Sequence, residues 1–187
     1  MKLLKCNTEE EVLKESVRLL TEGAVIGWFN GRSEYGPRAL GNRSILADAR
    51  NPKVKYRINN IKRRESWRPF APVVLEEEMS SWFDLGRPSP YMLFSAQVLD
   101  SKLGQVPGIE HVDKSSRPQT VTLEQNPRVY KLLQMFFKDT GVPLLLNTSF
   151  NVQEPIVESP KDAISTFISS DLDALVMGMF VIVKDKL

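Results

Sequence analysis

The sequence has too few cysteines and histidines for the sites that these residues usually build. Among its 187 residues there is one cysteine, Cys6, and one histidine, His111. A single cysteine cannot form an internal disulfide or a cysteine-rich metal centre. A single histidine lacks the partners that a zinc site or histidine-based catalysis needs. We therefore expect a site whose chemistry depends on neither cysteine nor histidine.

Long apolar runs are also missing. No stretch approaches the roughly 20 apolar residues that a membrane-spanning helix needs. The first residues, MKLLKCNTEEEV, contain too short an apolar run for a signal peptide and turn acidic at once. The apolar fraction of 42% and the charged fraction of 26% are those of an ordinary globular protein. We expect a cytoplasmic protein without membrane association, folded as one domain over residues 1–187.

The charge of the chain is unevenly distributed although its formal net value is only +2. Residues 32–68 hold 11 Lys and Arg against 3 Asp and Glu, whereas the rest of the chain holds 14 against 20. A basic segment in an otherwise acidic chain predicts that an anionic ligand binds there. The alternative is a solvated basic face, which the Gly, Pro and aromatic neighbours of these arginines disfavour.

Strand and helix patterns alternate along the chain without a repeat or a linker. Thr8 and Glu11 form a capping-box pattern, Asn126-Pro127 opens a helix that Gly141 ends, and Ser159-Pro160 opens the last helix. Further helices are predicted from Pro52 and over 76–83. Strands are predicted over 2–6, 24–29, 70–75, 91–98, 119–123, 142–146, 173–177 and 179–184. The fold class is α/β (α+β), with one mixed sheet.

Two loops after predicted buried strands carry the candidate chemistry. The first, GRSEYGPRALGNRS, spans residues 31–44 and holds three arginines that can clamp oxyanions: Arg32, Arg38 and Arg43. It lacks the Gly-Lys-Ser/Thr ending of a P-loop. The second, residues 147–151, presents amide and hydroxyl groups that suit a phosphate or ribose. Irregular turns with solvated side chains are the alternative for both loops.

More cations lie between and after these loops. Residues 62–70 (KRRESWRPF) place four cations around one tryptophan, and Arg117 precedes another predicted strand. No nucleophile–base pair is visible. Such an inventory is typical of catalysis by positioning and charge neutralisation, as in phosphoryl or nucleotidyl transfer.

The strings GRSEYGPRALGNRSILADAR, IKRRESWRPFAPVVLEE, SRPQTVT, GVPLLLNTSFN and EPIVESPKDAI resemble the C-terminal domain of the O-carbamoyltransferases. That family includes nodulation-factor and antibiotic-tailoring carbamoyltransferases, and the resemblance extends from about residue 20 to 183. It implies a YrdC-like fold, a twisted open mixed sheet flanked by helices. YrdC-like proteins hold phosphate and nucleotide with a Lys-x-Arg … Ser-x-Asn pattern, which residues 62–64 and 149–151 match.

The resemblance further implies that the chain binds carbamoyl phosphate and ATP and forms carbamoyl-adenylate with release of pyrophosphate. Magnesium would accompany the ATP phosphates, with no protein-held metal. The implied catalytic residues are Lys62, Arg68 and Ser149, and the implied substrate-binding residues are Arg38, Arg43, Arg64, Arg117, Asn147 and Asn151. In the family, an actin-like N-terminal domain binds the acceptor and transfers the carbamoyl group. This sequence lacks that domain, so a separate or fused partner is implied.

The alternative function is a non-catalytic YrdC-like subunit that binds RNA or nucleotide or docks on a partner. Gly, Pro and Leu interrupt the arginines, which disfavours nucleic acid. Under the main hypothesis, one pocket brings together five residues: Arg38, Lys62, Arg68, Arg117 and Ser149. Lys62 is then a surface residue that alanine replaces without harm to the fold.

Overall fold

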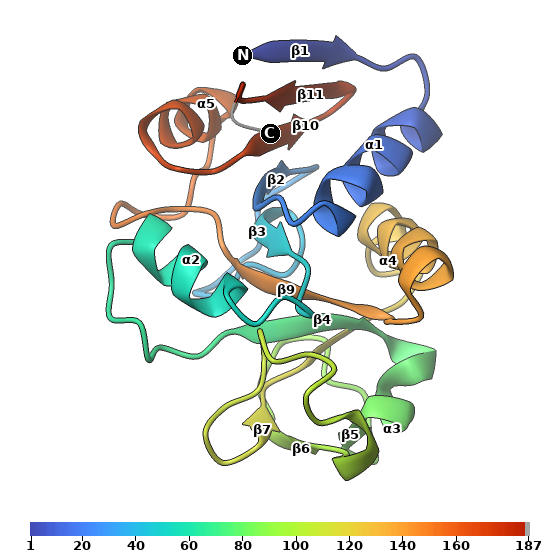
Figure 1. Cartoon of the computed structure of the whole chain (residues 1–187). Coiled ribbons are helices and arrows are strands. Elements are labelled where there is room, and N and C mark those ends of the chain that lie inside the picture. Colours follow the sequence, from blue (N-terminus) through green and yellow to red (C-terminus); the bar gives the residue numbers. More distant parts are fainter. Residues whose placement is uncertain (186–187) are drawn as a thin grey trace.

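The computed structural model describes residues 1–185 and contains two sheets (Figure 1). The larger is mixed: β2 and β10 pair in parallel, as do β4 and β8, and the other neighbours are antiparallel. Its eight strands lie in the order β1 (Lys2–Lys5), β11 (Phe180–Val183), β10 (Ala174–Met177), β2 (Ile26–Phe29), β3 (Arg43–Ala47), β9 (Leu144–Ser149), β4 (Ala71–Leu75) and β8 (Gln119–Val121).

Helices cover both faces of the larger sheet. Figure 1 shows α1 (Glu9–Thr21) and α4 (Pro127–Thr140) on one side, and α2 (Val54–Ile61) and α5 (Pro160–Ser169) on the other. Strands such as β3 and β4 are buried along their whole length because a helical layer or a loop covers each face. None of the helices that residues 1–185 form is long and apolar enough to cross a bilayer.

The caps predicted for α4 and α5 are present, whereas the capping box predicted for α1 forms only in half. Thr8 Oγ1 accepts the Glu11 N–H at 3.2 Å, but the Glu11 carboxylate accepts the Asn7 N–H at 2.7 Å and not that of Thr8. In α5, the Ser159 hydroxyl accepts the Asp162 N–H at 3.2 Å, and the Asp162 carboxylate accepts the Ser159 N–H at 2.9 Å. Asn126 accepts the Val129 N–H at the start of α4, which ends at left-handed Gly141. The N-terminal caps of α4 and α5 pair N–H groups that the first helical turn would leave without partners.

The expectation of a single sheet is wrong. A second, three-stranded sheet is formed by β5 (Phe83–Asp84), β6 (Ala96–Val98) and β7 (Ser115–Ser116). Two short helices, η1 (Glu76–Glu78) and α3 (Met79–Trp82), precede β5 in the chain, and a third, η2 (Asp100–Lys102), lies between β6 and β7. The strand expected over 91–98 shrinks to β6. Met92 adopts a left-handed conformation (φ 55°), which interrupts an extended strand.

Candidate anion-binding site

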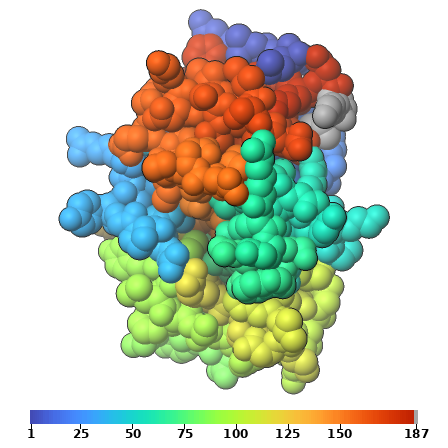
Figure 2. Space-filling model, turned by 90° about the vertical axis from the view of Figure 1, so that its left-hand side faces the viewer, coloured from blue at the N-terminus to red at the C-terminus, as the bar shows by residue number. Residues whose placement is uncertain are grey.

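A cavity of about 140 Å³ lies among loops from distant parts of the sequence. Its walls come from residues 37–39, Arg64, residues 69–71, Met92, Arg117 and residues 147–149 of β9. Figure 2 shows light-blue, teal, yellow and orange segments, which are far apart in the sequence, meeting on one face of the molecule. The volume is room for roughly four or five water molecules. It therefore suits a small phosphate compound rather than a whole nucleotide.

Three arginines line this cavity, and no carboxylate does: Arg38, Arg64 and Arg117. Within residues 1–185, none of the three forms an ion pair. The Arg64 Nε donates to Asn59 Oδ1 at 2.7 Å, and its guanidinium lies 4.7 Å from the centre of the Phe70 ring. Burial, with the charge of Arg38 nearby, lowers the pKa of Arg117. The cavity thus holds positive charge that its own walls do not neutralise, as an anion site requires.

Lys62 caps the C-terminal end of α2 and holds the turn after β9. Its Nζ donates to the carbonyl oxygens of Ser149 (2.7 Å) and Asn151 (2.8 Å), to Asn151 Oδ1 (2.8 Å) and to Ser149 Oγ (3.3 Å). Ser149 lines the cavity, and its hydroxyl donates to Asn151 Oδ1 at 2.8 Å. The structure therefore brings the Lys62, Ser149 and Asn151 side chains together.

The environment of Lys62 disfavours its charge. The residue is only 4% exposed, and burial, with the charge of Arg64 nearby, lowers its pKa to about 7, against an opposing effect of Glu154. The expectation that Lys62 is a surface residue is therefore wrong, and we expect alanine at this position to harm the fold. Removing the ammonium leaves several oxygen acceptors in this buried cluster without their donor, which destabilises a fold.

Phe150 anchors the same turn in the core. Its ring is fully buried and packs on Gly27 of β2, where an added Cβ would lie 2.6 Å from Phe150 Cζ. The Phe150 N–H donates to the Arg43 carbonyl at 2.8 Å. Gly27 is required because the ring needs the space of a side chain, a reason for glycine inside a strand. The anchor fixes where Ser149 and Asn151 lie.

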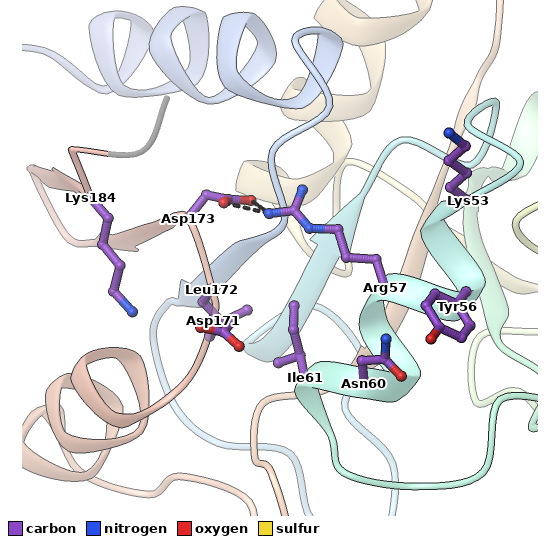
Figure 3. Close-up of a pocket in the computed structure, with 9 residues that line it drawn as sticks. All are labelled: Lys53, Tyr56, Arg57, Asn60, Ile61, Asp171, Leu172, Asp173 and Lys184. Carbon is purple, nitrogen blue, oxygen red and sulfur yellow. Dashed lines mark hydrogen bonds and ion pairs between the residues drawn. The ribbon is translucent and has the colours of Figure 1, made fainter.

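A larger cavity lies elsewhere. It has a volume of about 540 Å³ and is lined by α2, residues 171–173 and Lys184 (Figure 3). There Arg57 pairs with Asp173 at 2.5 Å, and Asp171 adds a second carboxylate. Its walls hold three cations, Lys53, Arg57 and Lys184, against the two carboxylates of Asp171 and Asp173, so most of its positive charge is offset by acidic groups of the same walls.

Comparison with known proteins places this chain in a family. The family model for the carbamoyltransferase C-terminus matches residues 17–184. The chain belongs to this family. It is 48% identical over 186 residues to the nodulation protein NolO of Bradyrhizobium diazoefficiens, an alignment that covers 97% of this chain and 34% of NolO. The chain spans about a third of the length of NolO and about a quarter of the length of the nodulation protein NolNO of Sinorhizobium fredii, two curated relatives that it matches.

Solved structures of other proteins share the fold of this carbamoyltransferase domain. Full-length HypF in its phosphate- and nucleotide-bound form superposes with a TM-score of 0.64 at 17% identity, covering 89% of this chain and 24% of HypF. Escherichia coli YciO gives a TM-score of 0.62 at 15% identity, covering 93% of this chain and 81% of YciO. The expected fold class, a YrdC-like mixed sheet flanked by helices, is confirmed.

The predicted site residues of the carbamoyltransferase domain divide into those at the cavity and those away from it. Arg38, Arg64, Arg117, Asn147 and Ser149 line it. Lys62 and Asn151 do not line it, but both side chains contact Ser149, which does. The expectation that Arg68 lines the same pocket is not met, because the Arg68 side chain is 48% exposed and pairs with Glu65 at 2.8 Å.

The expectation that Arg43 clamps an anion is contradicted. Its guanidinium donates to the carbonyls of Asn30, Gly31, Asn42 and Glu158 at 2.8–3.3 Å and lies 3.6 Å from the centre of the Phe29 ring. The residue is only 4% exposed. Arg43 therefore ties the 31–42 loop to the chain near residue 158 and has no free face for a ligand.

Sequence reasoning missed two buried amides that shape the cavity. Asn59 of α2 donates to the carbonyls of Ser66 and Arg68, both at 3.0 Å, and accepts from Arg64. Gln119 of β8 accepts from Asn147 at 2.9 Å. A polar residue between Ile58 and Ile61 on the buried side of a helix is a signal for Asn59. For Gln119 the sequence offers no comparable signal.

Proposed function

We propose that this domain binds carbamoyl phosphate and ATP and activates the carbamoyl group as carbamoyl-adenylate. The observation that carries the proposal is the convergence of Arg38, Arg64 and Arg117 with Ser149 around one small cavity free of carboxylates. Carbamoyl phosphate brings a dianionic phosphate, which guanidinium groups bind through paired hydrogen bonds. The proposal also agrees with membership of the carbamoyltransferase family.

The balance of atoms defines the reaction. Carbamoyl phosphate and ATP together contain four phosphorus atoms, whereas carbamoyl-adenylate and pyrophosphate contain three. Water must therefore release the fourth as inorganic phosphate and leave carbamate. A carbamate oxygen then attacks the α-phosphorus of ATP, and the bond to the leaving pyrophosphate breaks. The three arginines would neutralise the released phosphate, and Lys62 would hold the turn that presents Ser149.

ATP extends beyond the cavity in this proposal, because the cavity has room only for a small phosphate compound. HypF, which shares the fold, has been solved with phosphate and nucleotide bound, and this supports a nucleotide on a fold of this kind. Among residues 1–185 no group of three or more His, Cys, Asp or Glu could hold a metal ion. We propose that Mg²⁺ arrives with ATP, bound mainly by phosphate oxygens and water.

Transfer to an acceptor would require the remainder of a longer protein. NolO is about three times as long as the stretch that matches this chain. Exposed apolar side chains flank cavity-lining residues in the sequence: Tyr35 near Arg38, Trp67 near Pro69, and Tyr91 and Leu93 around Met92. Exposed apolar groups concentrated around a site are typical of a docking surface. We propose an acceptor-binding domain, fused or separate, as the occupant.

Nucleic-acid binding is the weaker candidate because much of the 32–68 basic segment is bonded within the protein. Arg50 pairs with Asp48, and Lys55 donates to the Glu110 carbonyl. The other engaged cations of the segment are Arg43, Arg57, Lys62, Arg64 and Arg68. Cations bonded in this way are poorly placed to form the continuous phosphate-binding stripe of a nucleic-acid protein.

Calorimetric titration with carbamoyl phosphate and a non-hydrolysable ATP analogue, separately and together, tests binding. A turnover assay then measures phosphate and pyrophosphate with and without the N-terminal part of a relative such as NolO. We expect both ligands to bind and the domain alone to turn over slowly, because an open site admits water that weakens each cation–phosphate contact. Fast carbamoylation of an alcohol by the domain alone, or pyrophosphate release without phosphate release, would contradict the proposal.

A further inference from the structure

The loop that carries Arg38 is closed by the side chain of Glu34. Glu34 Oε1 accepts the backbone N–H groups of Leu40 at 2.6 Å and Asn42 at 2.7 Å, with a longer contact from the Arg43 N–H at 3.4 Å. A carboxylate that accepts N–H groups forms charge-assisted bonds, which are about twice as strong as bonds between neutral groups. Arg38 lies midway in sequence between Glu34 and Asn42, so these bonds hold the two ends of its loop together.

Other groups hold the backbone of this loop but not the Arg38 side chain. The Ala39 carbonyl accepts the Asn147 amide at 3.1 Å, and the Leu40 carbonyl accepts the Gln119 amide at 2.8 Å. Arg38 is exposed and lines the arginine-lined cavity, and within residues 1–185 its guanidinium has no hydrogen bond or ion pair. The direction of this guanidinium is therefore set by the backbone of its own loop.

Glu34 lies outside the arginine-lined cavity. It lines a second cavity, of about 260 Å³, and within residues 1–185 it forms no ion pair with any of the three arginines of the first. The Glu34 carboxylate is therefore placed neither to contact an anion in the arginine-lined cavity nor to neutralise its cations. The backbone N–H groups that it accepts explain why a basic loop contains an acidic residue.

We infer that Glu34 is a positioning residue for anion binding and that it acts through Arg38. Its carboxylate keeps the loop closed in the free protein, so that Arg38 faces the cavity before an anion arrives. Binding then does not have to order the loop, and such preorganisation raises affinity. The inference rests on the proposed function, because it requires an anion in the cavity. It goes further by giving a role to a residue outside that cavity.

The negative charge of Glu34 makes the inference testable by the sign of the effect. A carboxylate near an anion site repels the anion, so its removal would tighten anion binding if charge were its only contribution. Loss of a positioning group has the opposite effect, because the opened loop must be ordered again when the anion binds. Weaker binding after the removal of a negative charge therefore indicates positioning.

Calorimetric titration of the intact chain with inorganic phosphate measures the effect. We expect Glu34→Ala to bind phosphate about 10-fold more weakly than the original chain. Glu34→Gln should bind it only about threefold more weakly, because glutamine keeps an oxygen acceptor without the charge. Unchanged or tighter binding by folded Glu34→Ala would overturn the inference.

Asp162→Ala is the matched control. The Asp162 carboxylate also accepts two backbone N–H groups, from Ser159 at 2.9 Å and from Glu158 at 3.3 Å, but Asp162 does not line the arginine-lined cavity. Phosphate affinity in this variant should stay within about twofold of the original value. A loss as large as that in Glu34→Ala would overturn the inference.

A double-mutant cycle distinguishes positioning from general damage to the fold. In the Arg38→Gln background, Glu34→Ala should change phosphate affinity by less than about twofold, because Glu34 then has no cation to position. Equal losses in both backgrounds would indicate a merely structural role and overturn the inference. If Glu34→Ala does not fold, Glu34→Gln in both backgrounds decides in the same way. An original chain that binds no phosphate would overturn the proposed function and this inference with it, whereas the other contrary results overturn the inference alone.

Discussion

The two cavities next to α2 differ mainly in how far the carboxylates in their walls neutralise their cations. The walls of the larger cavity hold three cations, Lys53, Arg57 and Lys184, against the carboxylates of Asp171 and Asp173, and Arg57 pairs with Asp173 (Figure 3). The smaller cavity, with about a quarter of that volume, contains three arginines and no carboxylate. Volume alone would select the larger cavity as the site. The smaller cavity is the better candidate for an anion site, because no carboxylate in its walls neutralises its three arginines. Such uncompensated charge disfavours folding unless an anionic ligand offsets it.

The largest expected effect is on anion affinity. Arg117→Gln removes a cation that no carboxylate neutralises, so inorganic phosphate or carbamoyl phosphate should bind about 10- to 150-fold more weakly, the range for a charged hydrogen bond. Calorimetry measures the loss. Arg57→Met is the matched control in the larger cavity, and it should change phosphate affinity less than about twofold. A larger loss in Arg57→Met than in Arg117→Gln would reverse the assignment of the two cavities.

The next effect is on the free energy of unfolding, which should fall more for the substitution in the larger cavity than for the one in the smaller cavity. Arg57→Met leaves Asp173, whose side chain is 10% exposed, without its ion-pair partner. Because the Arg57 side chain is itself 40% exposed, the full value of a buried pair does not apply, and we expect the free energy of unfolding to fall by about 1–2 kcal/mol. Arg117→Gln should change it by less than about 0.5 kcal/mol, or raise it. Urea unfolding of both variants checks the contrast, and equal losses would argue against it.

The smallest effect concerns pH. The pKa of Lys62 is lowered to about 7, so Lys62 is charged below that pH and neutral above it. Sulfate keeps its charge across this range, and its affinity should fall by about fivefold between pH 6 and pH 9 as the nearby cation is lost. In Lys62→Met the profile should be flat over the same range, provided that circular dichroism shows a folded protein. If the sulfate affinity of the original chain does not change between pH 6 and pH 9, the charge of Lys62 does not change over this range, which would contradict the prediction.

Local signals in the sequence predicted the helices well. Asn126-Pro127 and Gly141 bound α4, and Ser159 with Asp162 opens α5, because capping depends on residues within one turn. The second sheet could not be predicted in this way. Its strands β5 and β7 have two residues each, too few for any period to appear, and their pairing depends on contacts distant in sequence.

The site shows the same division between local and distant information. Sequence placed arginines at the loops, but it could not distinguish Arg38, which lines the cavity, from Arg43, whose guanidinium is bound by carbonyls as far away as residue 158. The orientation of Asn147 depends on Gln119, which is 28 positions away, and on Ala39, which is 108 positions away. Residue types can indicate an anion site, whereas which of its cations remain free is decided by the tertiary structure.

A titration of the amide-resolved NMR spectrum with inorganic phosphate tests the central claim most directly. The cavity with unneutralised arginines should bind the anion, so the largest shifts should appear at Ala39, Arg117 and residues 147–151. Residues 53–61 and 171–173, around the larger cavity, should change little apart from the end of α2 next to Lys62. Saturable shifts concentrated at residues 53–57 and 171–173, with residues 147–149 unchanged, would contradict the account.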